Sequence, residues 1–146
     1  MSNTKQPYFE ALVLGPGGIR DRVQALQGIP QSEAQLQGQV VEYLRLLGLR
    51  HTHPPNGGIR DKRTAAKLKW QGVSAGVPDL LIFERWQDRI TGESGIGIAL
   101  ELKSRKGRLS AEQDAWLNHL ESVGWLVGVP RTFEEARELI DKAVKK

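Results

Sequence analysis

The feature that most constrains the fold of this chain is the unbroken apolar run Leu80–Phe83, which follows the segment Gly-Val-Pro-Asp at 76–79. Four consecutive apolar residues bounded by turn-forming residues are typical of a strand that is buried on both faces, and we expect such a strand over 77–83. A polar turn region follows at 85–95, and residues 97–103 predict a second strand. The two strands predict a hairpin-like pair.

Helical periodicity flanks these strands. Apolar residues at helical spacing predict a helix from a candidate N-cap at Ser32 to Gly48, with an apolar face made of Leu36, Val40, Leu44 and Leu47. A second helix is expected to begin at Ser110 and to end at Gly124, with an apolar face made of Trp116, Leu117, Leu120 and Val123. A T-x-x-E capping box predicts the start of a last helix at Thr132.

Shorter elements complete the expected order. Residues 50–53 and 125–129 predict short strands, and residues 63–70 predict a short helix inside a loop region. The order of the main elements is then roughly αβββαβα, which favours an α/β or α+β domain in which helices cover one small sheet. We assign residues 1–31, which are turn-rich and show no clear period, to an N-terminal extension and residues 32–146 to a single domain.

Composition excludes several classes of function. The chain has 146 residues, of which 39% are hydrophobic and 26% are charged, as is typical of a soluble globular domain. It contains no cysteine, which excludes disulfide scaffolds, cysteine-ligated zinc, iron–sulfur clusters and thiol catalysis. No apolar run is long enough to span a bilayer and the first residues lack the pattern of a secretory signal, so we expect a cytoplasmic protein with no membrane partner.

Positive charge is concentrated in two stretches of the chain. Residues 45–70 contain seven Lys and Arg residues and one acid, and residues 103–108 contain four Lys and Arg residues and no acid. Such clusters are expected of a surface that binds phosphates, although a solvated basic surface is an equally good interpretation of charge alone. The residues that we predict to bind DNA are Arg60, Lys62, Arg63, Lys67, Lys69, Arg105, Lys106 and Arg108, with Trp70 as the candidate aromatic contact.

Two carboxylates and a lysine fall at corresponding places on the two predicted strands. Asp79 precedes the apolar run, and Glu101 and Lys103 share a face of the second strand because strand side chains alternate. The two carboxylates and the backbone carbonyl of Leu102 form a set of oxygen ligands that suits Mg²⁺, and Lys103 would then hold a water or stabilise charge on a phosphate. The structural alternatives are a salt bridge at a strand end and an aspartate in a turn.

Two helical residues can support this cluster. Glu33 lies at the N-terminal end of the apolar face of the first helix, and Gln113 lies on the apolar face of its own helix. Each also has a structural alternative, because Glu33 is a first-turn carboxylate favoured by the helix dipole and Gln113 forms a capping box with Ser110. We interpret His51 and His53 as strand-edge residues, since no third metal ligand is near them in the sequence.

The segments GVPDLLIF at 76–83 and IALELKSRKGRLSAEQ at 98–113 together resemble the VRR-NUC family, the virus-type replication-repair nucleases of the PD-(D/E)XK superfamily. The similarity extends over residues 32–141. It implies a restriction-endonuclease-like core, a mixed sheet flanked by helices, and Mg²⁺- or Mn²⁺-dependent hydrolysis of DNA phosphodiesters. The family motif matches, residue by residue, Asp79, Glu101, Lys103, Gln113 and Glu33.

The resemblance also implies a biological setting. Stand-alone members of the family are similar to small phage or bacterial DNA repair proteins that pair as homodimers and favour branched DNA. The implied activity is that of a structure-selective endonuclease acting on branched DNA such as four-way (Holliday) junctions. The alternative is a non-catalytic nucleic-acid-binding module that uses the basic segments 45–70 and 103–108, in which the carboxylates are structural.

Overall fold

The computed structural model describes residue 23 and residues 32–55 and 61–144. Within these residues the elements follow one another in the order α3 (Glu33–Leu46), β1 (His51–Thr52), α4 (Lys62–Trp70), β2 (Leu80–Ile82), β3 (Trp86–Gln87), β4 (Ser94–Gly95), β5 (Gly97–Leu100), α5 (Ala111–Ser122), β6 (Trp125–Gly128) and α6 (Phe133–Val144). The predicted elements that fall in this part of the chain are all found, with shorter strands than expected.

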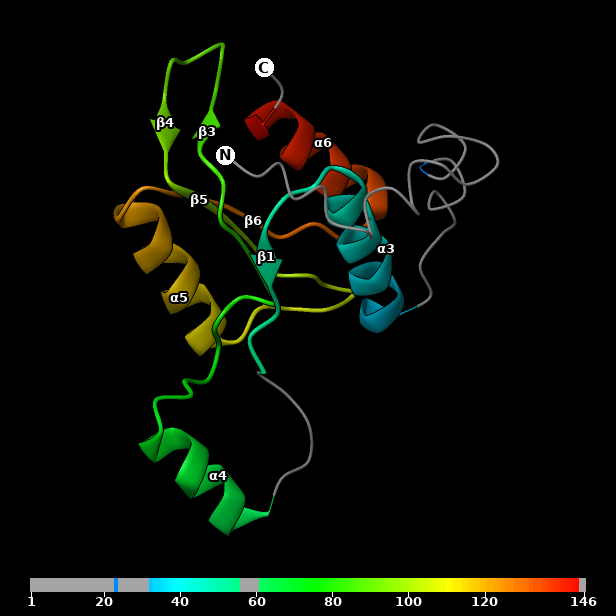
Figure 1. Ribbon diagram of the computed structural model, residues 1–146. Coiled ribbons are helices and arrows are strands. Elements are labelled where there is room, and N and C mark those ends of the chain that lie inside the picture. The colour runs from blue at the N-terminus through cyan, green and yellow to red at the C-terminus, as the bar shows by residue number, and fades with distance from the viewer. Residues whose placement is uncertain (1–22, 24–31, 56–60, 145–146) are drawn as a thin grey trace, which may run out of the picture.

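A four-stranded mixed sheet forms the centre of the domain (Figure 1). Its strand order is β1-β2-β5-β6, in which β5 and β6 are parallel and the other two neighbouring pairs are antiparallel. A parallel pair needs a crossover connection, which α5 supplies. The sheet lies between α5 on one side and the packed pair α3 and α6 on the other. This mixed sheet flanked by helices confirms the predicted fold class.

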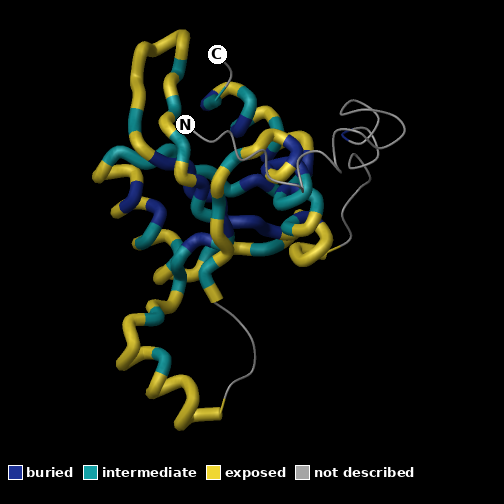
Figure 2. The backbone as a smooth tube through the Cα atoms, in the orientation of Figure 1, coloured by how far each residue is buried: buried dark blue, intermediate teal, exposed yellow. Residues whose placement is uncertain are grey.

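The hydrophobic core lies between the sheet and the pair α3 and α6. Leu80 and Ile82 of β2 face Leu100 and Ile98 of β5 across the ladder, and all four side chains are buried. Val23 also packs into this core, so packing begins before residue 32, where we placed the start of the domain. The helices contribute Leu36, Val40, Tyr43, Leu44 and Leu46 from α3 and Phe133, Ala136, Ile140 and Ala143 from α6. Figure 2 shows burial concentrated on these elements, whereas α4 is exposed.

The predicted helix starts are confirmed by their capping contacts. The Ser32 hydroxyl accepts a hydrogen bond from the Gln35 amide at 3.2 Å, and α3 ends before Gly48, whose φ is +69°. The α5 capping box at Ser110 is complete in both directions. The Thr132 hydroxyl accepts from the Glu135 amide at 3.2 Å at the start of α6. Side-chain capping thus satisfies amides that helical hydrogen bonding leaves free.

Three apolar residues that we assigned to buried faces are exposed instead. The exposed fractions are 37% for Leu47, 54% for Phe83 and 51% for Val123. Leu47 and Val123 are the C-cap residues of α3 and α5, and Phe83 follows the last residue of β2. Because the regular backbone has ended at each position, the spacing of apolar residues no longer predicts the direction in which the side chain points.

The segment between β2 and β5 contains more structure than the predicted polar turn. Residues 86–87 and 94–95 form a separate two-stranded antiparallel sheet, β3 and β4, in which Trp86 pairs with Gly95. Strands of two residues are too short to show an alternating pattern, which is why the sequence did not predict them. The glycine is required, because a Cβ at position 95 would lie 1.9 Å from the carbonyl oxygen of Gly124.

β5 is shorter than predicted, ending at Leu100 rather than Lys103. The chain still follows the course of β6 beyond that point, because the Glu101 amide donates to the Gly128 carbonyl at 3.0 Å and the Lys103 amide donates to the Pro130 carbonyl at 3.3 Å. Residues 101–103 therefore run alongside the chain that leaves β6, without regular pairing to β2. None of the helices that the structure describes combines the length and apolar character that a membrane crossing requires.

Candidate active site

The antiparallel register brings the start of β2 and the end of β5 to the same edge of the sheet. Leu80 pairs with Leu100, so the next positions outward are Asp79 and Glu101. Because side chains alternate along a strand, these two carboxylates lie on the face opposite to the buried leucines. Lys103, two residues further along, shares that face, and α5 covers it through a contact from Gln113. The structure therefore brings together the three residues that the strand motifs predicted.

Asp79 is held at the edge of the core by a backbone donor. One of its carboxylate oxygens accepts a hydrogen bond from the Leu102 amide at 2.8 Å. Burial raises the pKa of Asp79 above its ordinary value, and the negative charge of Glu33 acts in the same direction. The Leu102 amide and the nearby His53 and Lys103 lower the pKa and offset part of this effect. Within the described residues no hydrogen bond to the other carboxylate oxygen, Oδ1, is found.

Glu101 is almost completely buried, with 2% of its surface exposed. Its Oε1 accepts a hydrogen bond from Gln113 Nε2 at 2.6 Å and forms an ion pair with Lys103 Nζ at 3.3 Å. Burial raises the pKa of Glu101 to about 7, with the negative charge of Asp79 as the second cause and Lys103 as the largest opposing influence. A carboxylate in this position is readily stabilised by a further positive charge.

The donor atoms fit a hard divalent cation. Glu101 Oε2 is buried and has no hydrogen-bond partner among the described residues, which is costly for a carboxylate oxygen unless a ligand occupies the position. Residues 32–55 and 61–144 contain no group of three or more His, Asp or Glu side chains arranged to hold a metal. A site here would therefore rely on two carboxylates, with backbone, water and phosphate oxygens as the remaining ligands.

The Leu102 carbonyl is a suitable backbone ligand. Continuing the pairing of β2 with β5 outward would place Pro78 opposite Leu102. Proline has no N–H to donate, so β2 offers this carbonyl no donor at that position. The Leu102 amide, which would otherwise pair with the Pro78 carbonyl, donates to Asp79 instead. The end of the β2–β5 ladder therefore leaves the Leu102 carbonyl without a donor from Pro78.

Gln113 makes both of the contacts that the sequence left open as alternatives. Its Oε1 accepts from the Ser110 amide at 2.9 Å, which completes the capping box, and its Nε2 donates to Glu101. The start of α5 therefore fixes the orientation of the amide that contacts the buried carboxylate. Gly76 allows this close approach, since a Cβ there would lie 2.6 Å from the Glu112 carbonyl carbon at the same helix start.

Glu33 reaches the same edge of the sheet from the first turn of α3. Its Oε1 accepts a hydrogen bond from the Ser104 amide at 3.2 Å, directly after the segment that holds Glu101 and Lys103. Glu33 is exposed, unlike the other two acids. Its geometry is that of a residue that holds the 101–104 segment and adds negative charge near Asp79.

The structure brings His53, which we had interpreted as a strand-edge residue, next to this cluster. Its Nδ1 lies 2.6 Å from the backbone carbonyl oxygen of Asp79, and its charge lowers the Asp79 pKa. The contact follows from the pairing of β1 with β2, in which Thr52 lies opposite Leu81. The sequence predicted a short strand over residues 50–53 but not the strand with which it pairs.

Arg131 is a further residue near the site that sequence reasoning missed. Its Nη1 donates to the carbonyl oxygens of Ser104 at 2.6 Å, Gly107 at 2.7 Å and Arg105 at 3.3 Å. One guanidinium therefore holds three carbonyls of the loop that follows Lys103. A lone arginine after a proline carries no sequence signal for this role, because the role depends on carbonyls about 25 residues away.

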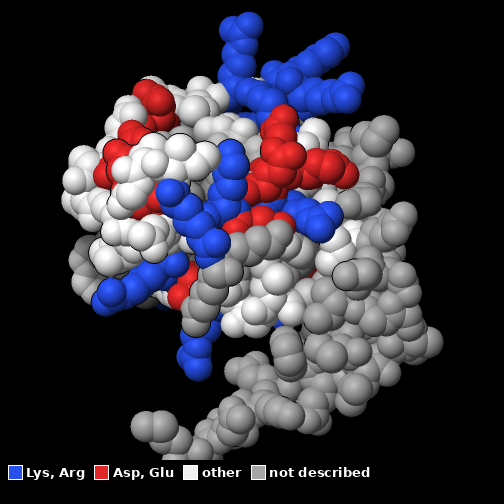
Figure 3. Space-filling view, turned by 90° about the horizontal axis from the view of Figure 1, so that it is seen from above, with Lys and Arg blue, Asp and Glu red and all other residues white. Residues whose placement is uncertain are grey.

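The residues predicted to bind DNA fall into two separate groups. Arg105, Lys106 and Arg108 lie on the loop between Lys103 and α5, beside the carboxylate cluster. The second group lies on α4 and consists of Lys62, Arg63, Lys67 and Lys69. Arg60 lies outside the described residues. Figure 3 shows Lys and Arg side chains standing out in several groups with Asp and Glu among them, so the face in that view is not uniformly basic.

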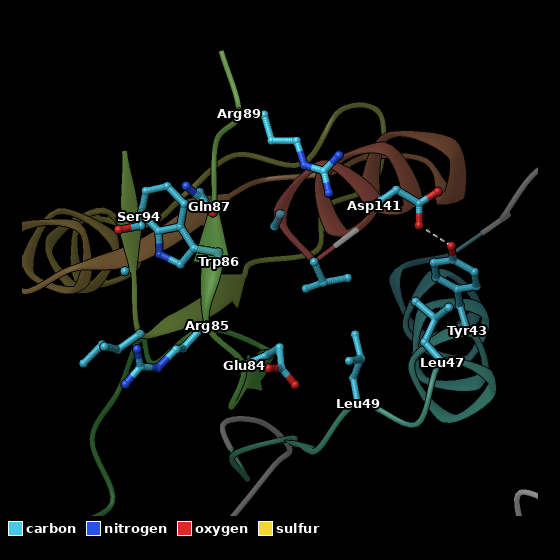
Figure 4. A pocket seen from close by; sticks show the side chains of 14 residues that line it. Tyr43, Leu47, Leu49, Glu84, Arg85, Trp86, Gln87, Arg89, Ser94 and Asp141 are labelled. Atoms are coloured by element: carbon cyan, nitrogen blue, oxygen red, sulfur yellow. Dashed lines mark hydrogen bonds between the residues drawn. The ribbon is translucent and has the colours of Figure 1, made fainter. Parts of the chain in front are cut away.

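A pocket of about 960 Å³ lies at the opposite end of the sheet (Figure 4). Its lining comes from the β3–β4 region and from the C-terminal ends of α3 and α6, and it includes Trp86, Leu47 and Leu49. Tyr43 donates a hydrogen bond to Asp141 at its margin. Neither Asp79 nor Glu101 lines it. This pocket is therefore distinct from the carboxylate cluster.

Comparison with known proteins gave two findings. A family model described as the VRR-NUC domain matches residues 20–133, a range that contains all five predicted catalytic residues and begins before residue 32. A solved structure described as a VRR_NUC domain protein is similar in fold, with a TM-score of 0.64 and 22% sequence identity, over 80% of this chain and 90% of that chain. No curated protein matches this chain.

Proposed function

Because this chain belongs to the VRR-NUC domain family, which consists generally of nucleases, we propose that it is a Mg²⁺- or Mn²⁺-dependent deoxyribonuclease. The proposed reaction is hydrolysis of phosphodiester bonds in branched DNA, with four-way junctions among the substrates. The observation that carries the proposal is the convergence of Asp79, Glu101 and Lys103 at one sheet edge, with a buried oxygen of Glu101 left without a partner in the described structure.

The cation would be held by Glu101 Oε2, by the Asp79 oxygen that does not accept from Leu102, and by the Leu102 carbonyl. Bound there, Mg²⁺ or Mn²⁺ supplies Lewis acidity that neutralises charge on the scissile phosphate and lowers the pKa of water. Water and a phosphate oxygen would supply the remaining ligands, which agrees with the preference of Mg²⁺ for keeping several waters.

The surrounding side chains orient the reacting groups. Lys103, whose Nζ lies 3.3 Å from Glu101 Oε1, is placed to hold an attacking water or the scissile phosphate. Gln113 holds the buried carboxylate in one orientation through its hydrogen bond to Oε1. Glu33 holds the backbone that follows Lys103 through the Ser104 amide. None of these residues needs to form a covalent intermediate.

Affinity for DNA would come from the basic groups. Arg105, Lys106 and Arg108 follow Lys103 on the loop before α5, and α4 carries the cations Lys62, Arg63, Lys67 and Lys69. Contacts of this kind bind phosphates, depend on salt and carry no direct sequence readout. Because one active site cuts one strand, a two-fold homodimer would suit paired cuts in a branched substrate. Sedimentation of the purified protein tests this pairing.

The test is a nicking assay on four-way junction, flap, fork and linear duplex DNA with Mg²⁺ or Mn²⁺. We expect Asp79→Asn and Glu101→Gln to lower the cleavage rate by at least roughly 100-fold, since they remove several kcal/mol of charge stabilisation. Asn at position 79 can still accept from the Leu102 amide, so folding is preserved. DNA affinity measured in EDTA should be unchanged or higher.

A matched control is Asp88→Asn, the same chemical change in the turn between β3 and β4, where Asp88 accepts from the Ile90 and Thr91 amides. It should cleave at the wild-type rate. If purified protein binds these DNAs but cleaves none of them with either metal, the chain is instead a non-catalytic nucleic-acid-binding module.

A further inference from the structure

The helix α4 stands apart from the rest of the described domain (Figure 1). None of its nine residues is buried. Most surface helices are stabilised by packing one apolar face against the core, and α4 lacks that contribution. Its N-terminus is fixed locally instead, because the Asp61 carboxylate accepts from the Thr64 amide at 2.9 Å and from the Thr64 hydroxyl at 2.7 Å.

The C-terminus of α4 is fixed as well. The Val73 amide donates to the Leu68 carbonyl at 2.9 Å, and the Gly72 amide donates to the Lys69 carbonyl at 3.1 Å. Gly72 has a φ of +98°, so these bonds form the Schellman motif that commonly ends a helix. The last helical residue, Trp70, is therefore presented from a defined backbone although the helix does not pack on the core.

One face of α4 combines two cations with an exposed aromatic ring. Arg63, Lys67 and Trp70 follow one another at spacings of four and three residues, which places them on the same side of the helix. Trp70 is 85% exposed. None of the ion pairs found in the described part of the chain involves a cation of α4.

A single exposed apolar residue needs no explanation, but Trp70 shares its helix face with two cations. Proteins that bind single strands use cations for successive phosphates and aromatic side chains for the faces of the bases. From residue 63 to residue 70 the helix rises about 10 Å, so the two cations and the ring face one short segment of a strand. Inside a duplex both faces of each base are covered by neighbouring pairs, so an internal paired base cannot stack on the indole, whereas an unpaired base can.

We propose that α4 is an arm that binds an unpaired strand at the branch of the DNA substrate, with Trp70 stacked on one unpaired base. Arg63 and Lys67 contact the phosphates beside that base. This inference rests on the proposed nuclease function and names its substrate class more closely, as branched DNA that carries an unpaired strand. Charge complementarity favours this occupant, since α4 contains four cations and no acid.

The test measures fluorescence anisotropy of labelled DNA in EDTA, where metal-dependent cleavage cannot occur. Three DNAs are compared: a blunt duplex, the same duplex with a single-stranded tail, and the same tail built from abasic residues. We expect Trp70→Ala to weaken binding of the tailed duplex by about 5-fold to 150-fold, the range for loss of one stacked base. Binding of the blunt and abasic-tailed DNAs should change by less than about twofold, because their phosphate contacts remain.

Further variants separate stacking from other causes. Trp70→Phe should keep most of the preference for the base-containing tail, whereas Trp70→Leu should lose it despite its apolar side chain. Lys67→Ala should weaken binding of both tailed DNAs, with or without bases in the tail, and should reduce the salt dependence of that binding. The matched control is Ile90→Ala, because Ile90 is 90% exposed on the turn between β3 and β4; it should change nothing. The midpoint of thermal unfolding should be unaffected by Trp70→Ala.

Several outcomes would contradict the proposal that α4 binds an unpaired strand. These are an equal effect of Trp70→Ala on all three DNAs, no effect on any of them, a change from dimer to monomer in sedimentation, or binding to anionic phospholipid vesicles that depends on Trp70 without any base preference. Failure of the nuclease proposal looks different: base-dependent binding persists in EDTA, but no DNA is cleaved with Mg²⁺ or Mn²⁺.

Discussion

Replacing Glu101 by glutamine should change how the stability of the metal-free protein depends on pH. The pKa of this carboxyl is raised from 4.5 to about 7 in the folded protein, chiefly by burial. Between these two values the unfolded chain releases the proton while the folded protein keeps it, so the free energy of unfolding falls as pH rises. Above pH 7 both states are ionised and the loss is complete. At 1.36 kcal/mol for each pKa unit, the loss amounts to about 3 kcal/mol.

Glu101→Gln keeps the shape of the side chain and its acceptor for Gln113 but cannot ionise. Urea unfolding followed by tryptophan fluorescence, in EDTA from pH 4.5 to pH 8, gives the free energy of unfolding of both proteins. We expect the variant to gain about 3 kcal/mol on the wild type across this interval. The raised pKa of Asp79 contributes a fall of the same sign in both proteins, so the difference between the two profiles reports chiefly on Glu101.

Adding Mg²⁺ at pH 8 provides a second measurement on the same pair of proteins. A cation that binds only the folded wild type stabilises it, by about 2.7 kcal/mol at one hundred times its dissociation constant, and the variant should gain much less. Parallel pH profiles for the two proteins, with a constant difference in unfolding free energy, would refute the reasoning, because they would mean that folding does not raise the pKa of Glu101.

Three further changes have expected outcomes. Arg131→Lys removes a guanidinium that holds three carbonyls of the loop after Lys103, and an ammonium cannot reproduce that geometry. Urea unfolding should show a loss of about 1.5–3 kcal/mol in the free energy of unfolding. The nicking rate should fall by roughly 10- to 100-fold. Gly76→Ala adds a Cβ 2.6 Å from the Glu112 carbonyl carbon at a φ of +83°, and should lower the free energy of unfolding by about 2–5 kcal/mol. Gly72→Ala adds a Cβ in open space at a φ of +98°, and should lower it by only about 1–2 kcal/mol. Ile140→Ala empties a fully buried position of α6 and should lower the unfolding free energy by about 2–5 kcal/mol, measured in the same way.

The sequence predicted those parts of the fold that depend on local pattern. The apolar face of α3, the capping residues Ser32 and Ser110, and the pairing of the two long apolar segments were all found in the structure. Each of these depends on residues within one element or on two apolar segments separated by a short stretch of chain. The roles predicted for the carboxylates and the lysine stay predictions, although the geometry brings the side chains together.

The features that the sequence did not predict depend on tertiary contacts. His53 reaches Asp79 only because β1 pairs with β2 across a long intervening segment, and Arg131 meets a loop about 25 residues earlier in the chain. Leu47 and Phe83, which the sequence assigned to buried faces, are exposed for a local reason. At these positions the apolar residues keep the spacing of the preceding helix or strand, but the regular backbone has already ended, and the spacing alone does not show that.

The shortness of β2, which ends its pairing with β5 just after Asp79, has a consequence for protein design. Pairing between β2 and β5 stops at Leu80 and Leu100, and the side chain of Asp79 then satisfies the Leu102 amide. A scaffold that is given these motifs on two long, fully regular strands would bond that amide to a main-chain oxygen and leave the aspartate free to rotate into solvent. A design that grafts these three side chains should therefore keep the strand that carries the aspartate short and keep the proline before the aspartate.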